Sequence, residues 1–346
     1  MRKGQNPAKM GLLAYRPSQL GILLVVYIPL QSEYFFDSLK ILKYQLASIH
    51  QNTPEEYNLH VFDNGSCREV KDALHKLYID GWIDWLTLSQ QNLGKAGVLN
   101  WALRGMPNEI ICYSDGDVYF RPDWYGTSLK ILKTFPETGM VTSQPCFFDS
   151  LRGMGRAHFA LRENQNFEFS TRIADSSIAE EYVRSIGNSP DLMARYAQHS
   201  WEIVCNKATG VEAVIGSSPF QFMGYKTALE KILPLPSTHG LNKDDDTQIT
   251  VRMDELGLLQ LSTLKPYVYH MGNQVDETTL GEIQRDCVED VLNNDLAVSV
   301  RSVRYQITPA KKTVLWLIHQ MARVPFLKLL VQRFYNLLFE YYAREK

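Results

Sequence analysis

The sequence lacks the features that mark disulfide-rich, zinc-binding and membrane-spanning proteins. Its five cysteines are odd in number, widely spaced and without a Cys-x-x-Cys pair, so neither a disulfide framework nor a zinc knuckle is indicated. No stretch reaches the roughly 18 consecutive apolar residues that a membrane-spanning helix needs. Unpaired thiols fit a reducing compartment, and we expect a cytoplasmic protein.

Strong charge of one sign is also missing. The formal net charge is -2, so the composition gives no reason to expect a nucleic-acid partner. The exception is local, because residues 311–346 carry seven Lys or Arg against two Glu. A phosphate-binding P-loop, a nucleophile-elbow serine and a zinc-protease helix are absent as well. These absences exclude several common enzyme classes.

From residue 21 the sequence alternates strand-like and helix-like segments, which is typical of an α/β fold with a Rossmann-like, mixed and mostly parallel sheet flanked by helices. Residues 21–28 form a continuous apolar run, as expected for a strand buried on both faces. The next segment places Leu39, Leu42 and Ile49 on one stripe of an amphipathic helix. We predict further strands at 58–62, 85–88, 109–114, 139–148 and 210–218, and helices over 70–78, up to Gly105 and over 244–257.

Residues 150–210 depart from this alternation. They read as polar and helical, with two helical stretches at 176–187 and 189–201. Ser189 and Pro190 are typical of the N-cap and the first residue of the second helix. We interpret the segment as an acceptor-side insertion that shapes a substrate cleft.

Asp115 and Asp117 stand one residue apart, directly after the strand predicted at 109–114. Two carboxylates this close repel each other when both are charged, so water, a helix end or a cation must relieve the repulsion. Gly116 lets the backbone bend until both carboxylates face one point. Mg²⁺ and Mn²⁺ take one or two protein carboxylates, with phosphate oxygens completing the sphere. The sequence therefore favours a metal-diphosphate site, with a solvated turn as the alternative.

A second acidic run, Asp244 to Asp246, opens the helix predicted at 244–257. Acids are favoured at the positive end of a helix, so capping is the simple explanation. Three acids in succession exceed what one cap needs, which makes the run a source of a general base.

Six stretches occur together in the order and spacing of one enzyme family. They are LVVYIPLQSEYFFDSLKILKYQLASI, VFDNGS, NLGKAGVLNWAL, YSDGDVYFRPDW, DDDTQITVRMDELG and YVYHMGN. Together they resemble the family 2 glycosyltransferases, whose fold is the GT-A nucleotide-diphospho-sugar transferase domain. The resemblance covers residues 20–275, and it leaves 1–19 as an N-terminal extension and 276–346 as a C-terminal helical, amphipathic extension.

The resemblance implies a metal site and a catalytic base. Asp115 and Asp117 would bind Mn²⁺ or Mg²⁺ and the diphosphate of the donor, and His270 would complete the metal sphere. A lone histidine after an apolar run is otherwise a hydrogen-bonded core residue. The base of the family is the aspartate of an acidic dipeptide, here Asp245-Asp246, with Asp246 as the residue expected to take the proton.

The resemblance also implies contacts to the nucleotide. Asp63 would contact the nucleoside and Lys95 would approach the nucleotide, although a lysine in a first helical turn is normally solvated. Pro29 and Gln31 occupy the place of the base-recognising contacts, but IPLQSEYF replaces the usual proline-threonine-tyrosine-asparagine wording there. Gly116 would lie against the donor between the two aspartates.

The sugar acceptor would bind near aromatic residues and the segment GSSPFQFMGY. Each of these aromatics has core packing as its default role. The acceptor residues that we predict are Trp124, Trp201, Phe220 and Phe222.

The last predicted helix, 326–342, has a narrow polar stripe in which Lys328, Gln332, Asn336 and Glu340 recur every four residues. Such a helix either docks on a protein body or lies in a membrane interface. With the rest, it suggests a peripheral enzyme of surface-polysaccharide assembly that moves a sugar from a nucleotide donor, UDP being the commonest carrier, to a glycan, a lipid-linked glycan or a small acceptor.

Two other functions stay open. A sugar-phosphate nucleotidyltransferase would use acid-held Mg²⁺ too, but it needs a glycine-rich, arginine-bearing loop after the first strand, where this sequence has YIPLQSEY. A non-catalytic nucleotide-sugar or carbohydrate-binding protein of the same fold would bind the donor without turnover.

Overall fold

The computed structural model of the chain describes residues 16–147, 155–187, 190–196, 198–236, 245–275 and residue 281. Apart from Arg16, these residues belong to one of the two units of the chain, Pro17–Val300. The acidic residue Asp244 and the amphipathic segment 326–342 lie outside the described residues, as do most of the predicted N- and C-terminal extensions.

Twelve strands are found in the described residues. They are β1 (Leu20–Val26), β2 (Tyr57–Asp63), β3 (Trp85–Leu88), β4 (Ile110–Ser114), β5 (Val118–Phe120), β6 (Thr138–Thr142), β7 (Phe167–Ile173), β8 (Ser200–Asn206), β9 (Glu212–Ile215), β10 (Gln221–Tyr225), β11 (Leu259–Ser262) and β12 (Val268–His270). The α-helices are α1 (Ser38–Asn52), α2 (Arg68–Ile79), α3 (Gly94–Gly105), α4 (Trp124–Thr134), α5 (Gly155–Arg162), α6 (Ser176–Ser185), α7 (Pro190–Tyr196), α8 (Lys226–Leu229) and α9 (Asp245–Glu255). Two short 3-10 helices are η2 (Glu33–Phe35) and η3 (Glu230–Ile232).

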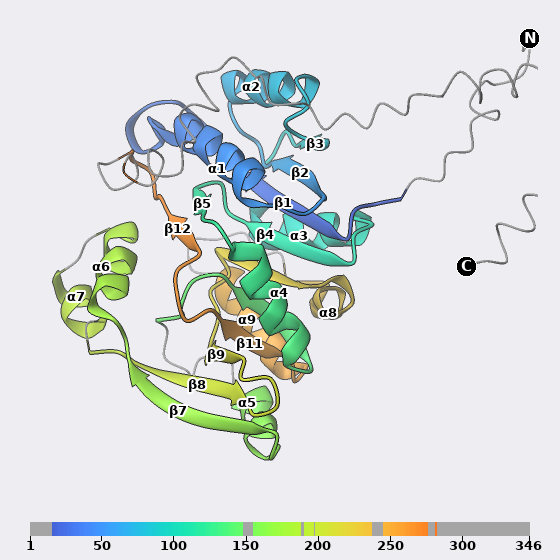
Figure 1. Ribbon diagram of the computed structural model, residues 1–346. Coiled ribbons are helices and arrows are strands. Elements are labelled where there is room, and N and C mark those ends of the chain that lie inside the picture. The colour runs from blue at the N-terminus through green and yellow to red at the C-terminus, as the bar shows by residue number, and fades with distance from the viewer. Residues whose placement is uncertain are drawn as a thin grey trace, which may run out of the picture. The chain divides into compact units, whose positions relative to one another are not determined.

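Ten of the strands form one mixed sheet in the order β3-β2-β1-β4-β10-β6-β11-β9-β8-β7. The half that contains β3, β2, β1 and β4 is parallel, because each connection passes through a helix. β10 enters between β4 and β6 and runs antiparallel to both. β5 and β12 form a separate two-stranded sheet. Figure 1 shows the β7–β8 hairpin at the end of the sheet opposite β3.

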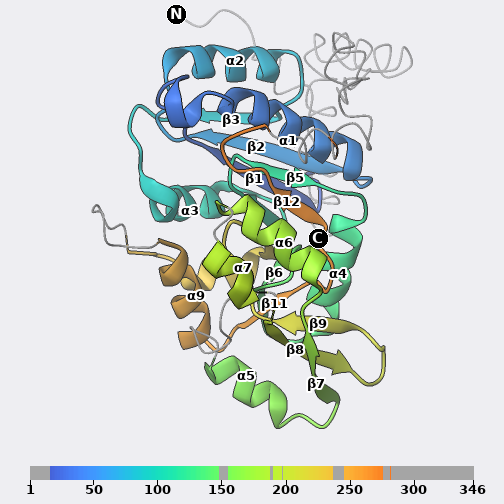
Figure 2. The same ribbon diagram turned by 90° about the vertical axis from the view of Figure 1, so that its left-hand side faces the viewer.

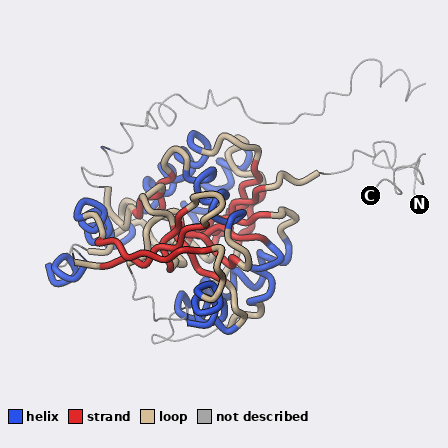
Figure 3. Tube along the Cα trace, turned by 60° about the horizontal axis from the view of Figure 1, so that its bottom comes forward, coloured by secondary structure: helices blue, strands red, loops and turns tan. Residues whose placement is uncertain are grey.

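Helices cover both faces of the sheet (Figure 3). The apolar run of β1 serves both faces, because Ile22 and Leu24 point toward one and Leu23 points toward the other. The first two share a core with α1, α2 and α4, whereas Leu23 shares a core with α3 and α9. Burial of each such side chain contributes roughly 1.5–3 kcal/mol, so the continuous apolar run is what places β1 in the middle of the sheet.

The segment 150–210 contains more strand than its sequence predicted. The two expected helices are present as α6 and α7, which lie side by side in Figure 2, but β7 before them and β8 after them pair antiparallel over seven residues. Most side chains of β7 are exposed, so its sequence carries no apolar alternation. No helix within the described residues is both long enough and apolar enough to cross a membrane.

Candidate active site

The site lies at the carboxyl ends of β1 and β4. β1 has parallel β2 on one side and parallel β4 on the other, and the chain crosses between the two sides after β3. Ligands of open α/β sheets bind at such a switch point, beyond the carboxyl ends of the strands. A cavity of about 370 Å³ opens here, and its lining includes Asp115, Gly116, Asp117 and Lys95. The predicted aspartate pair and the lysine therefore share one cavity.

Asp115 is held through its backbone and its side chain. Its N–H donates to the carbonyl of Phe220 (2.8 Å), and its carbonyl accepts from Gln45 Nε2 (2.7 Å). Its Oδ1 accepts from the hydroxyl of Tyr113 at 2.5 Å. Burial, and then the nearby charge of Asp115, raise the pKa of Tyr113 well above its ordinary value, so the phenol keeps its proton and donates it. β4 and α1 thus set the orientation of this carboxylate.

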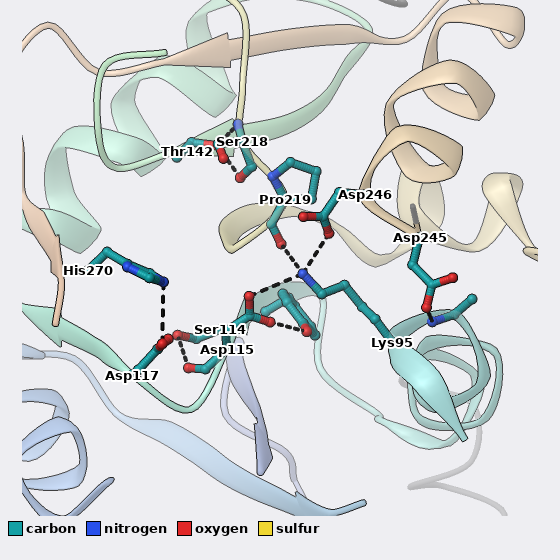
Figure 4. A network of polar contacts seen from close by, with 12 residues as sticks. Lys95, Ser114, Asp115, Asp117, Thr142, Ser218, Pro219, Asp245, Asp246 and His270 are labelled. Carbon is teal, nitrogen blue, oxygen red and sulfur yellow. Dashed lines mark hydrogen bonds and ion pairs between the residues drawn. The ribbon is translucent and has the colours of Figure 1, made fainter. Parts of the chain in front are cut away.

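Lys95 joins the aspartate pair to the acidic helix (Figure 4). Its Nζ lies 2.7 Å from Asp246 Oδ1, 3.1 Å from Asp115 Oδ2 and 3.3 Å from the carbonyl of Pro219. Burial opposes the charge of the ammonium, but the two carboxylates together outweigh it and raise the pKa of Lys95 above its ordinary value. The lysine is a fixed cation at neutral pH rather than the solvated side chain that a first helical turn usually carries.

The two residues of the acidic dipeptide face different partners. Asp245 Oδ2 accepts from the backbone N–H of Ala96 (3.2 Å) and therefore caps α3 rather than its own helix. Gly94 makes this approach possible, because its φ is +68° and a Cβ there would lie 3.1 Å from Asp245 Oδ2. Asp246 instead turns toward Lys95, and its side chain is 45% exposed. Only the second aspartate is arranged to meet a substrate.

Asp117 and His270 form the other polar pair of the site. His270 Nε2 lies 3.3 Å from Asp117 Oδ2, and the backbone N–H of Met271 donates to the carbonyl of Asp117 (2.8 Å). The pairing of β12 with β5 brings the two residues together. His270 Nδ1 lies 3.3 Å from the carbonyl of Ser185, which only a ring N–H can satisfy, and Phe220 packs edge-on against the ring. Nε2 is therefore directed at the carboxylate.

The donor atoms of this pair fit a divalent cation. Asp117 Oδ1 is buried with no hydrogen-bond partner in the described part of the chain, and Nε2 of a neutral His270 would oppose a carboxylate oxygen unless a proton or a cation lies between them. Oxygen and imidazole nitrogen are ligands that Mn²⁺ accepts. Within the described residues, no group of three or more His, Cys, Asp or Glu side chains is arranged to hold a metal. The carboxylate of Asp115 is already bound by Tyr113 and Lys95, which separates it from the pair.

The residues predicted to contact the nucleoside do not all reach the cavity. Asp63 is fully buried, accepts from the backbone N–H of Ser66 (3.0 Å) and lies 3.8 Å from Lys71 Nζ. Asp63, Pro29 and Gln31 are absent from the cavity lining. Asn64, the residue after Asp63, lines it instead.

Most of the predicted acceptor aromatics are packed in the core. Trp124 is fully buried and donates from Nε1 to Thr53 Oγ1 (3.1 Å), and Trp201 is only 4% exposed. Phe222 is fully buried and stacks on Tyr113. None of these three presents a ring face to a ligand in this structure. Phe220 is half-buried against His270, beside the site.

Sequence motifs did not point to Tyr113 or Gln45. Tyr113 is the polar-tipped residue of the buried strand IICYS, and Gln45 lies on the apolar face of α1, fully buried. A polar group in an otherwise apolar buried element needs a hydrogen-bond partner, and that requirement was the available signal. Both turn out to bond the aspartate segment.

Comparison with known proteins gives one family match. Residues 27–185 match the model of Glycosyl transferase family 2, and they include Asp115, Asp117 and Lys95 but not Asp246 or His270. No curated protein matches the sequence.

Several solved structures are similar to the chain at low sequence identity. The mannosyltransferase PcManGT from Pyrobaculum calidifontis, in complex with GDP-Man and Mn2+, is 16% identical with a TM-score of 0.42, covering 72% of this chain and 55% of that chain. TarS 1-349 from S. aureus, in complex with UDP-GlcNAc, is 16% identical with a TM-score of 0.43, covering 80% and 68%. This chain thus spans about half the length of the mannosyltransferase chain. The match over residues 27–185 confirms the family that the sequence motifs predicted, glycosyl transferase family 2.

Proposed function

We propose that this protein is a glycosyltransferase that moves a sugar from a nucleotide-diphosphate donor to an acceptor hydroxyl, with Asp246 as the general base. The observation that carries the proposal is the bridge through Lys95. One ammonium contacts Asp115 at the end of β4 and Asp246 at the start of α9, so two acidic motifs more than a hundred residues apart meet beside a cavity. A solvated turn and a helix cap would not require each other in this way.

On the donor side, the proposal assigns the diphosphate to the cavity between Lys95 and the aspartate pair. Lys95 offers a positive charge to the phosphates. Asp117 and His270 are the residues that would hold Mn²⁺ or Mg²⁺. When bound, such a cation neutralises the negative charge that develops on a departing diphosphate.

On the acceptor side, the hydroxyl attacks the anomeric carbon while Asp246 takes its proton. The new C–O bond forms as the bond from the anomeric carbon to the diphosphate oxygen breaks, and the diphosphate leaves with the electron pair. Lys95 orients the base through Oδ1. A single base on the face opposite the leaving group implies inversion at the anomeric carbon.

The wider assignment stays part of the proposal. UDP as carrier, a glycan or lipid-linked acceptor and work at a membrane surface in polysaccharide assembly rest on the sequence resemblance and on the segment 326–342, which lies outside the described residues.

The test compares the wild type with Asp246→Asn, using a panel of nucleotide sugars and acceptors with Mn²⁺. We expect Asp246→Asn to lower turnover by at least about 100-fold, because general-base catalysis contributes about 10²–10⁴. Donor affinity should stay close to that of the wild type, since Asp246 does not line the donor cavity. Release of nucleotide and calorimetric binding measure the two effects.

Glu255→Gln is the matched control, because it removes one carboxylate charge from the exposed end of the same helix. Unchanged turnover in Asp246→Asn would move the base elsewhere. Donor binding by the wild type without turnover on any acceptor would favour a non-catalytic binding protein.

A further inference from the structure

Two asparagines line the cavity with no role in the chemistry above. Asn64 follows β2, and Asn92 lies in the loop before α3. Asn64 is only 3% exposed, and its backbone N–H donates to the carbonyl of Val26 (2.7 Å), so its position is fixed against β1. A buried amide that faces a cavity is a group from which a ligand can receive hydrogen bonds.

The backbone fixes which way both amides point. The N–H of Leu93 donates to Asn64 Oδ1 (2.8 Å), and the N–H of Gly94 donates to Asn92 Oδ1 (2.8 Å). A backbone N–H can only donate, so the atoms that receive these bonds must be oxygens. Asn64 Nδ2 then donates to Asn92 Oδ1 at 2.9 Å. The orientation of the pair follows from the hydrogen bonds and leaves no alternative flip.

The remaining hydrogen-bonding capacity of the pair is that of a donor. Both side-chain oxygens are engaged, whereas one N–H of Asn64 and the two of Asn92 have no protein acceptor in the described ranges. The pair can therefore receive an oxygen or an unprotonated nitrogen, and it opposes an amino group.

The pair and the aspartates lie on opposite sides of β1. Asn64 extends from β2 and Asp115 from β4, and the two strands flank β1, so they are about 10 Å apart at about 4.8 Å per strand. Tyr27 and Phe35, which also line the cavity, supply aromatic surface near the end of β1. A nucleoside diphosphate has a flat base at one end and its phosphates at the other, which matches this distribution.

We propose that Asn64 and Asn92 form the base-specificity site of the donor cavity and that they read a carbonyl oxygen on the nucleobase. Uracil, thymine and guanine offer such an oxygen, whereas adenine presents an amino group instead. Asp63, buried and bound to Ser66, does not perform this role in the structure. The inference rests on the proposed function for the nucleotide-sugar donor.

The test measures binding of UDP, GDP and ADP with Mg²⁺ by calorimetry, in the wild type and in Asn92→Asp. An aspartate still accepts from Gly94 and Asn64 but has no N–H to donate. We expect the wild type to prefer UDP or GDP over ADP by at least about tenfold, and the variant to lose most of that preference, because a net hydrogen bond is worth about a factor of ten. ADP affinity should change much less.

The new negative charge of the aspartate would weaken all three nucleotides alike, and Gln91→Glu measures that effect. Gln91 is exposed, adjacent in sequence and absent from the cavity lining. Asn92→Ser provides an uncharged variant whose hydroxyl can still accept from Gly94, should the aspartate variant not fold.

The outcomes separate this inference from the proposed function. Equal losses for the three nucleotides, or an unchanged preference, would overturn the base-reading role alone. Preference that depends on Asn92 without any sugar transfer would support the role and remove the proposed reaction. If the wild type binds none of the three nucleotides, both fail.

Discussion

Lys95 is the residue at which three distant parts of the chain meet. Its ammonium is shared by Asp115, by Asp246 and by the carbonyl of Pro219, which belongs to the segment before β10. A hydrogen-bond exchange between Thr142 and Ser218 fixes that segment, since Thr142 Oγ1 donates to the carbonyl of Ser218 (2.9 Å) and accepts from its N–H (2.8 Å). The position of the cation therefore depends on β4, β6 and α9 together.

Lys95→Met should destabilise the protein and stop the reaction. The variant leaves Asp115 and Asp246 without their shared cation, and removing one partner of a largely buried ion pair costs about 3–5 kcal/mol. We expect a loss of free energy of unfolding toward the lower end of that range, because the Asp246 side chain is partly exposed. Urea unfolding and nucleotide release measure the two effects.

Lys76→Met, at an exposed position on α2, is the control for loss of a lysine charge. Equal stability of Lys95→Met and Lys76→Met would show that the bridge does not hold the site together.

Among the elements, those with strong local patterns were predictable. The apolar run of β1 and the helical stripe of α1 were both visible in the sequence, because burial on two faces and on one stripe leaves distinct periodicities. β7 was missed because its side chains are mostly exposed, so nothing in its pattern required a sheet. The place of β10 between β4 and β6 depends on pairing with strands far away in sequence, which no local signal reports.

The site follows the same division. The aspartate pair and Lys95 were found from motifs, whereas the direction of Asp63 away from the cavity depends on the turn that holds Ser66 and Lys71 around it. That Asp245 caps α3 and leaves Asp246 for Lys95 is decided by how two helix starts approach each other. Tertiary geometry of this kind cannot be read from one segment at a time.

The contact between β2 and β3 predicts a dependence of stability on pH. Burial lowers the pKa of His60 on β2 to about 4. An unfolded histidine titrates near pH 6.5, so between about pH 6.5 and 4 the unfolded state binds a proton that the folded state does not. The free energy of unfolding therefore falls as the pH drops through this window, and the contribution of His60 is fully present above it.

At about pH 5 the loss from His60 should reach about 2 kcal/mol, at 1.36 kcal/mol per pH unit. We expect urea unfolding of the wild type at about pH 7.5 and pH 5 to show a larger drop than His60→Gln, which cannot be protonated. His75→Gln, at an exposed position on α2, should behave like the wild type. If all three proteins lose stability equally, other groups account for the acid sensitivity.

At the scale of the whole molecule, the cavity is built by elements that meet only in the folded state. Its lining combines the ends of β1 and β4, the start of α3, η2 and residues 272–273 that follow β12. Asn273 Nδ2 donates to the carbonyl of Tyr34 (3.0 Å), and the N–H of Val275 donates to Asp37 Oδ2 (3.2 Å), so the segment after His270 is tied to the region around η2. A ligand in this cavity would contact both halves of the chain and should stabilise the native state as a whole.

This linkage makes thermal unfolding a test of the cation site. A ligand that binds only the native state at about 100 times its Kd adds about 2.7 kcal/mol. We expect a matching nucleotide sugar to raise the Tm clearly more with Mn²⁺ than with EDTA, because the cation would join the phosphates to Asp117 and His270. Asp117→Asn should lose most of the part that depends on Mn²⁺ and keep the part that does not. The exposed Asp72→Asn is the control for a lost carboxylate and should respond like the wild type. A Tm increase that is the same with Mn²⁺ and with EDTA would mean that Lys95 and the backbone hold the diphosphate without a metal, and the pair of Asp117 and His270 would then be an ion pair of the fold.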